Sequence, residues 1–167
     1  MRLPLEAGGK TSRTVRKGSA RQDLAQDRLF WRRVLDRWTE TRGLPAHSAG
    51  GYRNRRFVIV RGAAWITLYR AMFPFPQIGV FLRCTGFAGE AFLTLADQAR
   101  LDLEPRLRSE PGPDATFQWG TTYHPGMIDI AAILPAAAPW NGDADDQQIA
   151  WLVRVGAVWW RGFASLA

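Results

Sequence analysis

Three short apolar segments in the middle of the chain determine the predicted fold. They are rich in β-branched and aromatic residues and span Phe57–Val60, Ala64–Tyr69 and Ile78–Leu82. Turn-forming residues separate them, Arg61-Gly62 after the first and a Pro-Phe-Pro triplet after the second. This pattern predicts a three-stranded antiparallel meander. Because the segments are too apolar for a sheet with water on both faces, helices before and after them are expected to cover one face.

Two amphipathic segments flank the meander. Asp23 is a suitable N-cap for a helix that runs to about Thr41, and its apolar positions fall on one side at helical spacing. A second helix is predicted to begin at Thr85 or Gly86 and to reach about Leu103. Pro105 is expected to end it.

Two more strands are predicted at Thr116–Trp119 and Met127–Leu134, and a last helix follows with Asp143 or Asp145 as its N-cap. The expected fold is therefore α+β. An antiparallel sheet of about five strands is packed by helices, mainly on one face, in the order α-β-β-β-α-β-β-α. With 167 residues, the chain is long enough to bury the core of one such domain, which we assign to residues 23–167.

Residues 1–22 have too little apolar surface to offset the entropy of ordering them, so the sequence predicts a flexible basic arm. Three of its cations, Arg13, Arg16 and Lys17, are candidate contacts to a phosphate backbone. The alternative is a solvated tail with no ligand.

The charge is unevenly distributed. Residues 1–83 carry 17 basic and 5 acidic side chains, a net +12, whereas residues 84–167 carry 5 and 10, a net −5. This asymmetry favours a polyanionic partner, either DNA or RNA. The alternative explanation of the excess positive charge is the codon usage of a GC-rich genome, because all but two of the 22 basic residues are arginine.

The best candidate for an anion site is the loop Leu44–Asn54 and the start of the strand after it. It combines Gly50-Gly51 with Arg53, Arg55 and Arg56. Glycines allow the backbone to approach a phosphate, and guanidinium groups can bind it in a bidentate manner. We therefore predict a non-catalytic accessory module that contacts nucleic acid through the arm and this loop.

The alternative function is protein interaction or homodimer formation through an exposed aromatic surface. The chain has eight tryptophans, including Trp140 in a predicted turn and the adjacent pair Trp159-Trp160. Two neighbouring positions on a helix are not expected to point inward together. One of the pair is therefore expected to lie on the surface.

Catalytic and metal-binding patterns are weak, so we predict no catalytic residue, no metal and no cofactor. The single cysteine, Cys84, is expected to be a buried apolar residue. The element order matches the restriction-endonuclease-like core, but the second and third strands lack the acids and lysine that such a site needs. The best enzyme hypothesis is a pocket formed by Tyr123, His124 and Asp129 near Trp119.

No apolar run reaches the ~18–20 residues of a membrane span, and the N-terminus lacks the apolar core of a secretion signal. A cytoplasmic bacterial protein without membrane contact is the expectation.

Several aromatic segments resemble one known family. They include Phe30–Leu35, Gln77–Leu82, Phe117–Gly120 and Ile149–Leu152, and from about residue 28 onward the chain resembles the bacterial domain-of-unknown-function family 4268. Members of that family occur alone or behind segments that resemble nucleases. The resemblance implies an association with nucleic-acid or defence systems, and it implies no activity and no catalytic residues.

Overall fold

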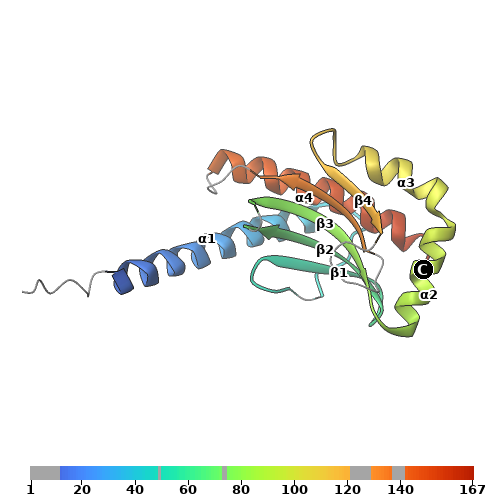
Figure 1. Cartoon of the computed structure of the whole chain (residues 1–167), viewed down its shortest axis with the longest axis horizontal. Helices are drawn as coiled ribbons and strands as arrows, with labels where there is room; N and C mark the ends of the chain where they lie inside the picture. Colours follow the sequence, from blue (N-terminus) through green and yellow to red (C-terminus); the bar gives the residue numbers. More distant parts are fainter. Residues whose placement is uncertain (1–11, 49, 73–74, 121–128, 137–141) are drawn as a thin grey trace, which may run out of the picture.

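The computed structural model describes residues 12–48, 50–72, 75–120, 129–136 and 142–167 (Figure 1). The predicted α+β class and element order are confirmed, except that the second helix is divided in two. The elements are α1 (Ser12–Glu40), β1 (Asn54–Val60), β2 (Ala64–Ala71), β3 (Gln77–Cys84), α2 (Gly86–Gln98), α3 (Arg100–Ser109), β4 (Thr116–Gly120), β5 (Asp129–Pro135) and α4 (Gly142–Ala164).

The strands form one antiparallel sheet in the order β1-β2-β3-β5-β4. The first three strands are the predicted meander, and β5 pairs with β3, which leaves β1 and β4 as the two edges. The register pairs Phe57 with Ile66, and Ile66 with Leu82. Because side chains alternate between the faces of a strand, these three residues point to the same face.

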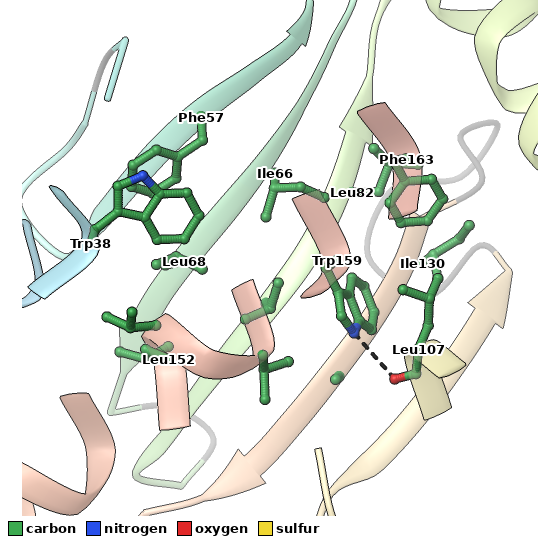
Figure 2. Close-up of a cluster of buried hydrophobic side chains, with 14 of the residues drawn as sticks. Trp38, Phe57, Ile66, Leu68, Leu82, Leu107, Ile130, Leu152, Trp159 and Phe163 are labelled. Carbon is green, nitrogen blue, oxygen red and sulfur yellow. Dashed lines mark hydrogen bonds between the residues drawn. The ribbon is translucent and has the colours of Figure 1, made fainter. Parts of the chain in front are cut away.

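That face is the covered one, and it holds the hydrophobic core. Trp38 of α1 stacks on Phe57 with ring centres 3.8 Å apart, and Trp159 of α4 donates a hydrogen bond to the Leu107 carbonyl oxygen at 3.1 Å (Figure 2). The core cluster takes β2 and β3 residues from this face, such as Leu68, and not those that alternate with them. The prediction that helices cover mainly one face is therefore confirmed.

Helix α4 packs against β1, β2 and β3, and it also contacts α1 and α3. Gly156 permits this close approach, because a Cβ there would lie 2.6 Å from Cδ2 of Leu68 and 3.0 Å from Cζ3 of Trp38. Trp160, four residues later, donates a hydrogen bond to the Val58 carbonyl oxygen at 2.9 Å. Both contacts fix α4 against the first two strands.

Helix α1 begins at Ser12, and not at Asp23 as predicted. The second half of the predicted flexible arm, residues 12–22, is therefore helical, and residues 1–11 lie outside the described residues. Arginine, lysine, alanine and glutamine in this segment are good helix formers, and the single Gly18 does not interrupt the helix. Figure 1 shows that this part of α1 extends away from the sheet.

The predicted second helix is two helices, and Pro105 does not end it. The chain leaves helical geometry at Ala99, with φ −86° and ψ 6°, and α3 then runs to Ser109 with Pro105 inside it. Pro105 is the sixth residue of α3, so it removes one backbone hydrogen bond and its ring crowds the carbonyl four residues earlier, and the helix continues in spite of this cost. The break instead allows Leu103 and Leu107 to join the core.

Candidate nucleic-acid interface

The meander and the loop before it carry charge of one sign. Residues 41–83 contain seven arginines and no aspartate or glutamate, so β1, β2 and β3 contribute no carboxylate to either face. The structure separates these arginines into a group on the covered face and a group away from it. The seven are Arg42, Arg53, Arg55, Arg56, Arg61, Arg70 and Arg83.

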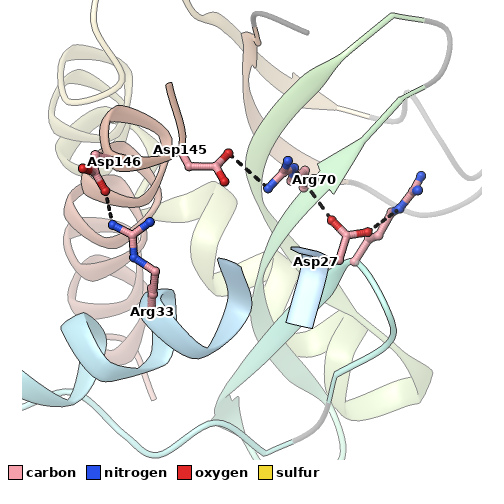
Figure 3. Close-up of polar contacts among 6 residues, drawn as sticks. Asp27, Arg33, Arg70, Asp145 and Asp146 are labelled. Atoms are coloured by element: carbon pink, nitrogen blue, oxygen red, sulfur yellow. Dashed lines mark hydrogen bonds and ion pairs between the residues drawn. The ribbon is translucent and has the colours of Figure 1, made fainter. Parts of the chain in front are cut away.

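Arg70 is buried in the covered face, where β2 meets α1 and α4 (Figure 3). Its Nη1 lies 3.5 Å from Oδ1 of Asp145, and its Nε lies 4.0 Å from Oδ1 of Asp27. The guanidinium carbon lies 4.2 Å from the centre of the Phe30 ring. Burial lowers the pKa of Arg70 to about 10, against the opposing effect of the two carboxylates. The group is therefore still charged at neutral pH, and it joins two helices to the sheet.

Two predicted anion ligands, Arg53 and Arg55, are also engaged by the fold. Nε of Arg53 donates a hydrogen bond to Oδ2 of Asp27 at 3.2 Å. Nη1 of Arg55 donates to the carbonyl oxygens of Gly51 and Asn54 at 2.9 and 2.7 Å. Burial also lowers the pKa of Arg55. Both guanidinium groups already have partners within the protein.

Arg56, the third predicted ligand, points the other way. It follows Arg55 on β1, so its side chain leaves from the opposite face of the sheet. It is exposed, and its guanidinium carbon lies 5.3 Å from the centre of the Trp65 ring. The structure therefore does not bring Arg53, Arg55 and Arg56 together as one anion-binding cluster.

Arg56 belongs to a group of side chains on the face of the meander away from the core cluster. We call this group the open face, because the core helices pack on the opposite side of the sheet. Among the side chains that alternate with the core positions, six are polar or aromatic and lie in its middle: Arg56, Trp65, Thr67, Tyr69, Phe81 and Arg83.

Two aromatic side chains of the open face, Tyr69 and Phe81, are in contact, and Trp65 lies on the same side of β2. Trp65 is directly opposite Arg83, and Tyr69 is directly opposite Gly79 across the β2–β3 pair. The Tyr69 ring covers Gly79, where any Cβ would overlap it, and its centre lies 5.5 Å from that of Phe81. All three aromatic rings are half-buried, so part of each is accessible to solvent.

The cations of the open face stack on these rings. Arg83 places its guanidinium carbon 5.2 Å from the centre of the Phe81 ring, which resembles the arrangement of Arg56 on Trp65. Both are in the range of cation–π interactions. Between the two pairs lies Thr67, which is 3% exposed and whose hydroxyl oxygen is buried without a hydrogen-bond partner within the described residues.

The other arginines of the basic half are mostly exposed. Arg42 and Arg61 in loops, and Arg28, Arg32 and Arg37 on α1, form no ion pair within the described residues. Arg33 differs, because it pairs with Asp146 of α4 (Figure 3). The acidic half therefore neutralises some of these cations and leaves others to solvent.

The three predicted ligands of the arm, Arg13, Arg16 and Lys17, lie in the first turns of α1. Their backbone is helical, and their side chains lie outside the described part of the chain.

The tryptophan pair that suggested an exposed aromatic surface is packed. Trp159 is fully buried, and Trp160 is half-buried against the core cluster, so the expectation that one of them lies free on the surface is wrong. Helix α4 contacts both the sheet and the helices α1 and α3, so side chains on more than one side of it are covered. Trp159 therefore packs in the core while Trp160 donates its hydrogen bond to the Val58 carbonyl oxygen. Trp140 lies outside the described residues.

The proposed enzyme pocket is also outside the described part: Tyr123 and His124 are not described, nor is the side chain of Asp129. Within the described residues, no group of three or more His, Cys, Asp or Glu side chains is arranged to hold a metal ion. Cys84 is buried, as predicted. None of the described helices is both long enough and apolar enough to cross a membrane.

The open face was missed by sequence reasoning, although a signal for it exists. Trp65, Thr67 and Tyr69 occupy alternate positions of β2, and Phe81 and Arg83 do so in β3. Period-two alternation places each set on one side of its strand. What the alternation does not give is which side the helices cover.

No protein-family model, curated protein or solved structure matches the chain. The resemblance to the bacterial domain-of-unknown-function family 4268 therefore remains a prediction.

Proposed function

We propose that this protein is a nucleic-acid-contacting module and that the open face, with the exposed arginines beside it, is the contact surface. One observation supports this most directly. Residues 41–83 carry seven arginines without a single acid, and Arg56 and Arg83 lie on the sheet face opposite the core. A surface with cations and no carboxylate of its own strands attracts a polyanion and does not repel it.

The structure changes which residues the proposal uses. Arg53 and Arg55 are assigned to the fold, because their guanidinium groups already bind Asp27 and backbone carbonyls. Arg56 stays as a ligand, and Arg61 in the β1–β2 turn joins it. The cations of α1, including Arg13, Arg16 and Lys17, are further candidates for phosphate contacts.

The test is fluorescence anisotropy with labelled DNA and RNA over a range of salt concentrations. Arg56→Gln and Arg61→Gln should each weaken binding, and each should reduce the slope of log K against log salt by about 0.7–0.9, which corresponds to one phosphate contact. Both residues are exposed, so folding should be unaffected.

Arg106→Gln is the matched control. Arg106 is an exposed arginine of α3, in the acidic half of the chain, with no ion pair within the described residues. Its loss should leave binding and the salt slope unchanged. If Arg106→Gln reduced affinity as much as Arg56→Gln, attraction would depend only on net charge and the assigned surface would be wrong.

A second candidate function is association with another protein through α2 and α3. Phe87 is 89% exposed and Leu101 is 90% exposed, and a hollow of about 420 Å³ lies beside Leu101, lined by Arg100, Glu104, Pro105 and Arg108. Large apolar side chains with this exposure are typical of contact sites when they cluster. Light scattering would support this function if a dimer forms and Phe87→Ser disrupts it; a single-chain mass at high concentration would exclude self-association.

A further inference from the structure

We propose that the open face binds single-stranded nucleic acid by stacking bases on Trp65 and Phe81, with the exposed Arg56 close to the phosphates. This inference rests on the proposed function, since it specifies the kind of nucleic acid that the same surface recognises. Three features of the open face support it: its rings, its cations and the hydroxyl between them.

The rings provide a platform for bases. Trp65 and Tyr69 lie on either side of Thr67 on one face of β2, Phe81 lies opposite Thr67 on β3, and all three rings are partly accessible to solvent. Strands in a sheet are about 4.8 Å apart, so side chains on neighbouring strands form a nearly flat surface. Aromatic side chains on an antiparallel sheet are a common way to stack two or three unpaired bases.

The cations show that planar groups fit on these rings. The guanidinium group of Arg56 lies over Trp65, and that of Arg83 lies over Phe81. A guanidinium plane and a nucleobase use the same face of an aromatic ring, and arginine can also stack on a base. If Arg56 moved from Trp65 to a phosphate, it would free that ring for a base and keep its charge in the same area.

Thr67 is the third feature. Its hydroxyl oxygen lies between Arg56 and Phe81 in the register and has no hydrogen-bond partner within the described residues. A buried polar group without a partner is costly, and a ligand that supplies a hydrogen bond offsets that cost. A base edge or a ribose hydroxyl above the rings could supply it once the Arg56 side chain, directly opposite Thr67, moves.

A duplex would make few contacts with the rings of this surface. Its bases are paired and stacked inside the helix, so the protein would contact phosphates alone and no base would stack on the three rings. Single strands expose both faces of each base, and stacking on aromatic side chains is tolerant of sequence. The chemistry of the open face therefore favours an unpaired strand of DNA or RNA.

The experiment compares labelled single strands of about 16 nucleotides, as DNA and as RNA, with a duplex of the same sequence, at about 50 and about 200 mM salt. Phe81→Leu and Trp65→Leu remove one ring each. Each should weaken single-strand binding by about 5-fold or more. The same variants should change duplex binding by less than about 2-fold, because the duplex contributes phosphate contacts alone.

Two controls separate stacking from loss of structure. Phe81→Tyr keeps a ring and should restore single-strand affinity close to that of the unmodified protein. Phe87→Leu makes the same change as Phe81→Leu on α2, where the side chain is 89% exposed, and should have no effect on binding. Circular dichroism and thermal melting confirm that each variant is folded.

The remaining outcomes distinguish this inference from the proposed function. Equal binding of single strands and duplex, reduced by Arg56→Gln but not by Phe81→Leu, would overturn stacking and leave phosphate contact in place. No binding of any oligonucleotide at the lower salt would overturn both. A dimer detected by light scattering that Phe81→Leu dissociates would show that a second copy of the chain occupies the open face, and this would also overturn the inference.

Discussion

The two faces of the sheet hold arginines in opposite ways. On the covered face, Arg70 lies between two carboxylates, Asp27 and Asp145, supplied by α1 and α4. On the open face, the exposed Arg56 lies over the Trp65 ring and forms no ion pair within the described residues. A buried cation requires an anion from the fold itself, whereas a cation on an accessible ring can exchange that contact for an external anion. The same residue type is therefore structural on one face and available for binding on the other.

The largest expected difference between the faces is in stability. Arg70→Met should lower the free energy of unfolding by about 3–5 kcal/mol, because it leaves buried carboxylates without their cation. Arg56→Met removes an exposed guanidinium group and should change that free energy by no more than about 0.5 kcal/mol. Urea denaturation of both variants measures the two effects with the same substitution. Similar costs at the two positions would contradict the division of the arginines into two groups.

A smaller effect is expected from filling space at two glycines. Gly156→Ala places a Cβ against Leu68 and Trp38 in the closed core, where crowding costs about 1–3 kcal/mol, partly offset by the higher helix propensity of alanine. Gly79→Ala displaces the Tyr69 ring, which can move toward solvent, so its cost should stay below about 1 kcal/mol.

Thermal melting measures the stability of both glycine variants, and the chemical shifts of the Tyr69 ring report whether it moves. A larger loss for Gly79→Ala than for Gly156→Ala would indicate that the open face is as tightly packed as the covered one.

The smallest expected effect is on pH dependence. Burial raises the pKa of Asp145, so its contribution to the free energy of unfolding increases as the pH falls from above this raised pKa to its ordinary value of 3.8. Hydrogen bonds from Arg108 and Arg100 lower the pKa of Glu104 on α3, so its contribution is present above the ordinary value of 4.5 and is lost as the pH falls through the lowered pKa.

Urea denaturation at neutral and acidic pH separates these signs. On acidification, the stability of the unmodified protein should rise relative to Asp145→Asn and fall relative to Glu104→Gln. For Glu104 the change should be under about 1 kcal/mol, because a solvated ion pair contributes little. Shifts of the same sign for both variants would contradict the assigned environments.

The fold was largely predictable because strands have a local signature. The meander, β4, β5 and α4 were recognised from apolar periodicity and turn residues, which depend on nearby sequence only. The errors were at helix ends. Ser12 was missed because the polar first half of α1 has no apolar stripe, and the break at Ala99 was missed because the local signal of Pro105 was stronger.

The candidate site was less predictable, because it depends on which face the helices cover. The sequence shows that Arg55 and Arg56 leave β1 on opposite sides. It does not show that Asp27, many residues earlier, forms ion pairs with Arg53 and Arg70, or that the Arg56 guanidinium group lies over the Trp65 ring. These contacts join segments far apart in the chain, so composition alone overstates how many arginines are free to bind a ligand.

The position of β1 at the edge of the sheet has a consequence that is independent of any ligand. Its apolar segment Phe57–Val60 is short and β-branched, which are features of sequences that nucleate amyloid growth. The edge is partly closed, because the Val58 carbonyl oxygen accepts a hydrogen bond from Trp160 and the Arg56 carbonyl oxygen accepts one from the Ser48 N–H group. Arg55 and Arg56 precede this segment, and Arg61 follows it. Two chains that joined along this edge would bring their cations together with no acid in the segment to neutralise them. The arginines therefore act as gatekeepers that protect the folded protein from edge-to-edge aggregation.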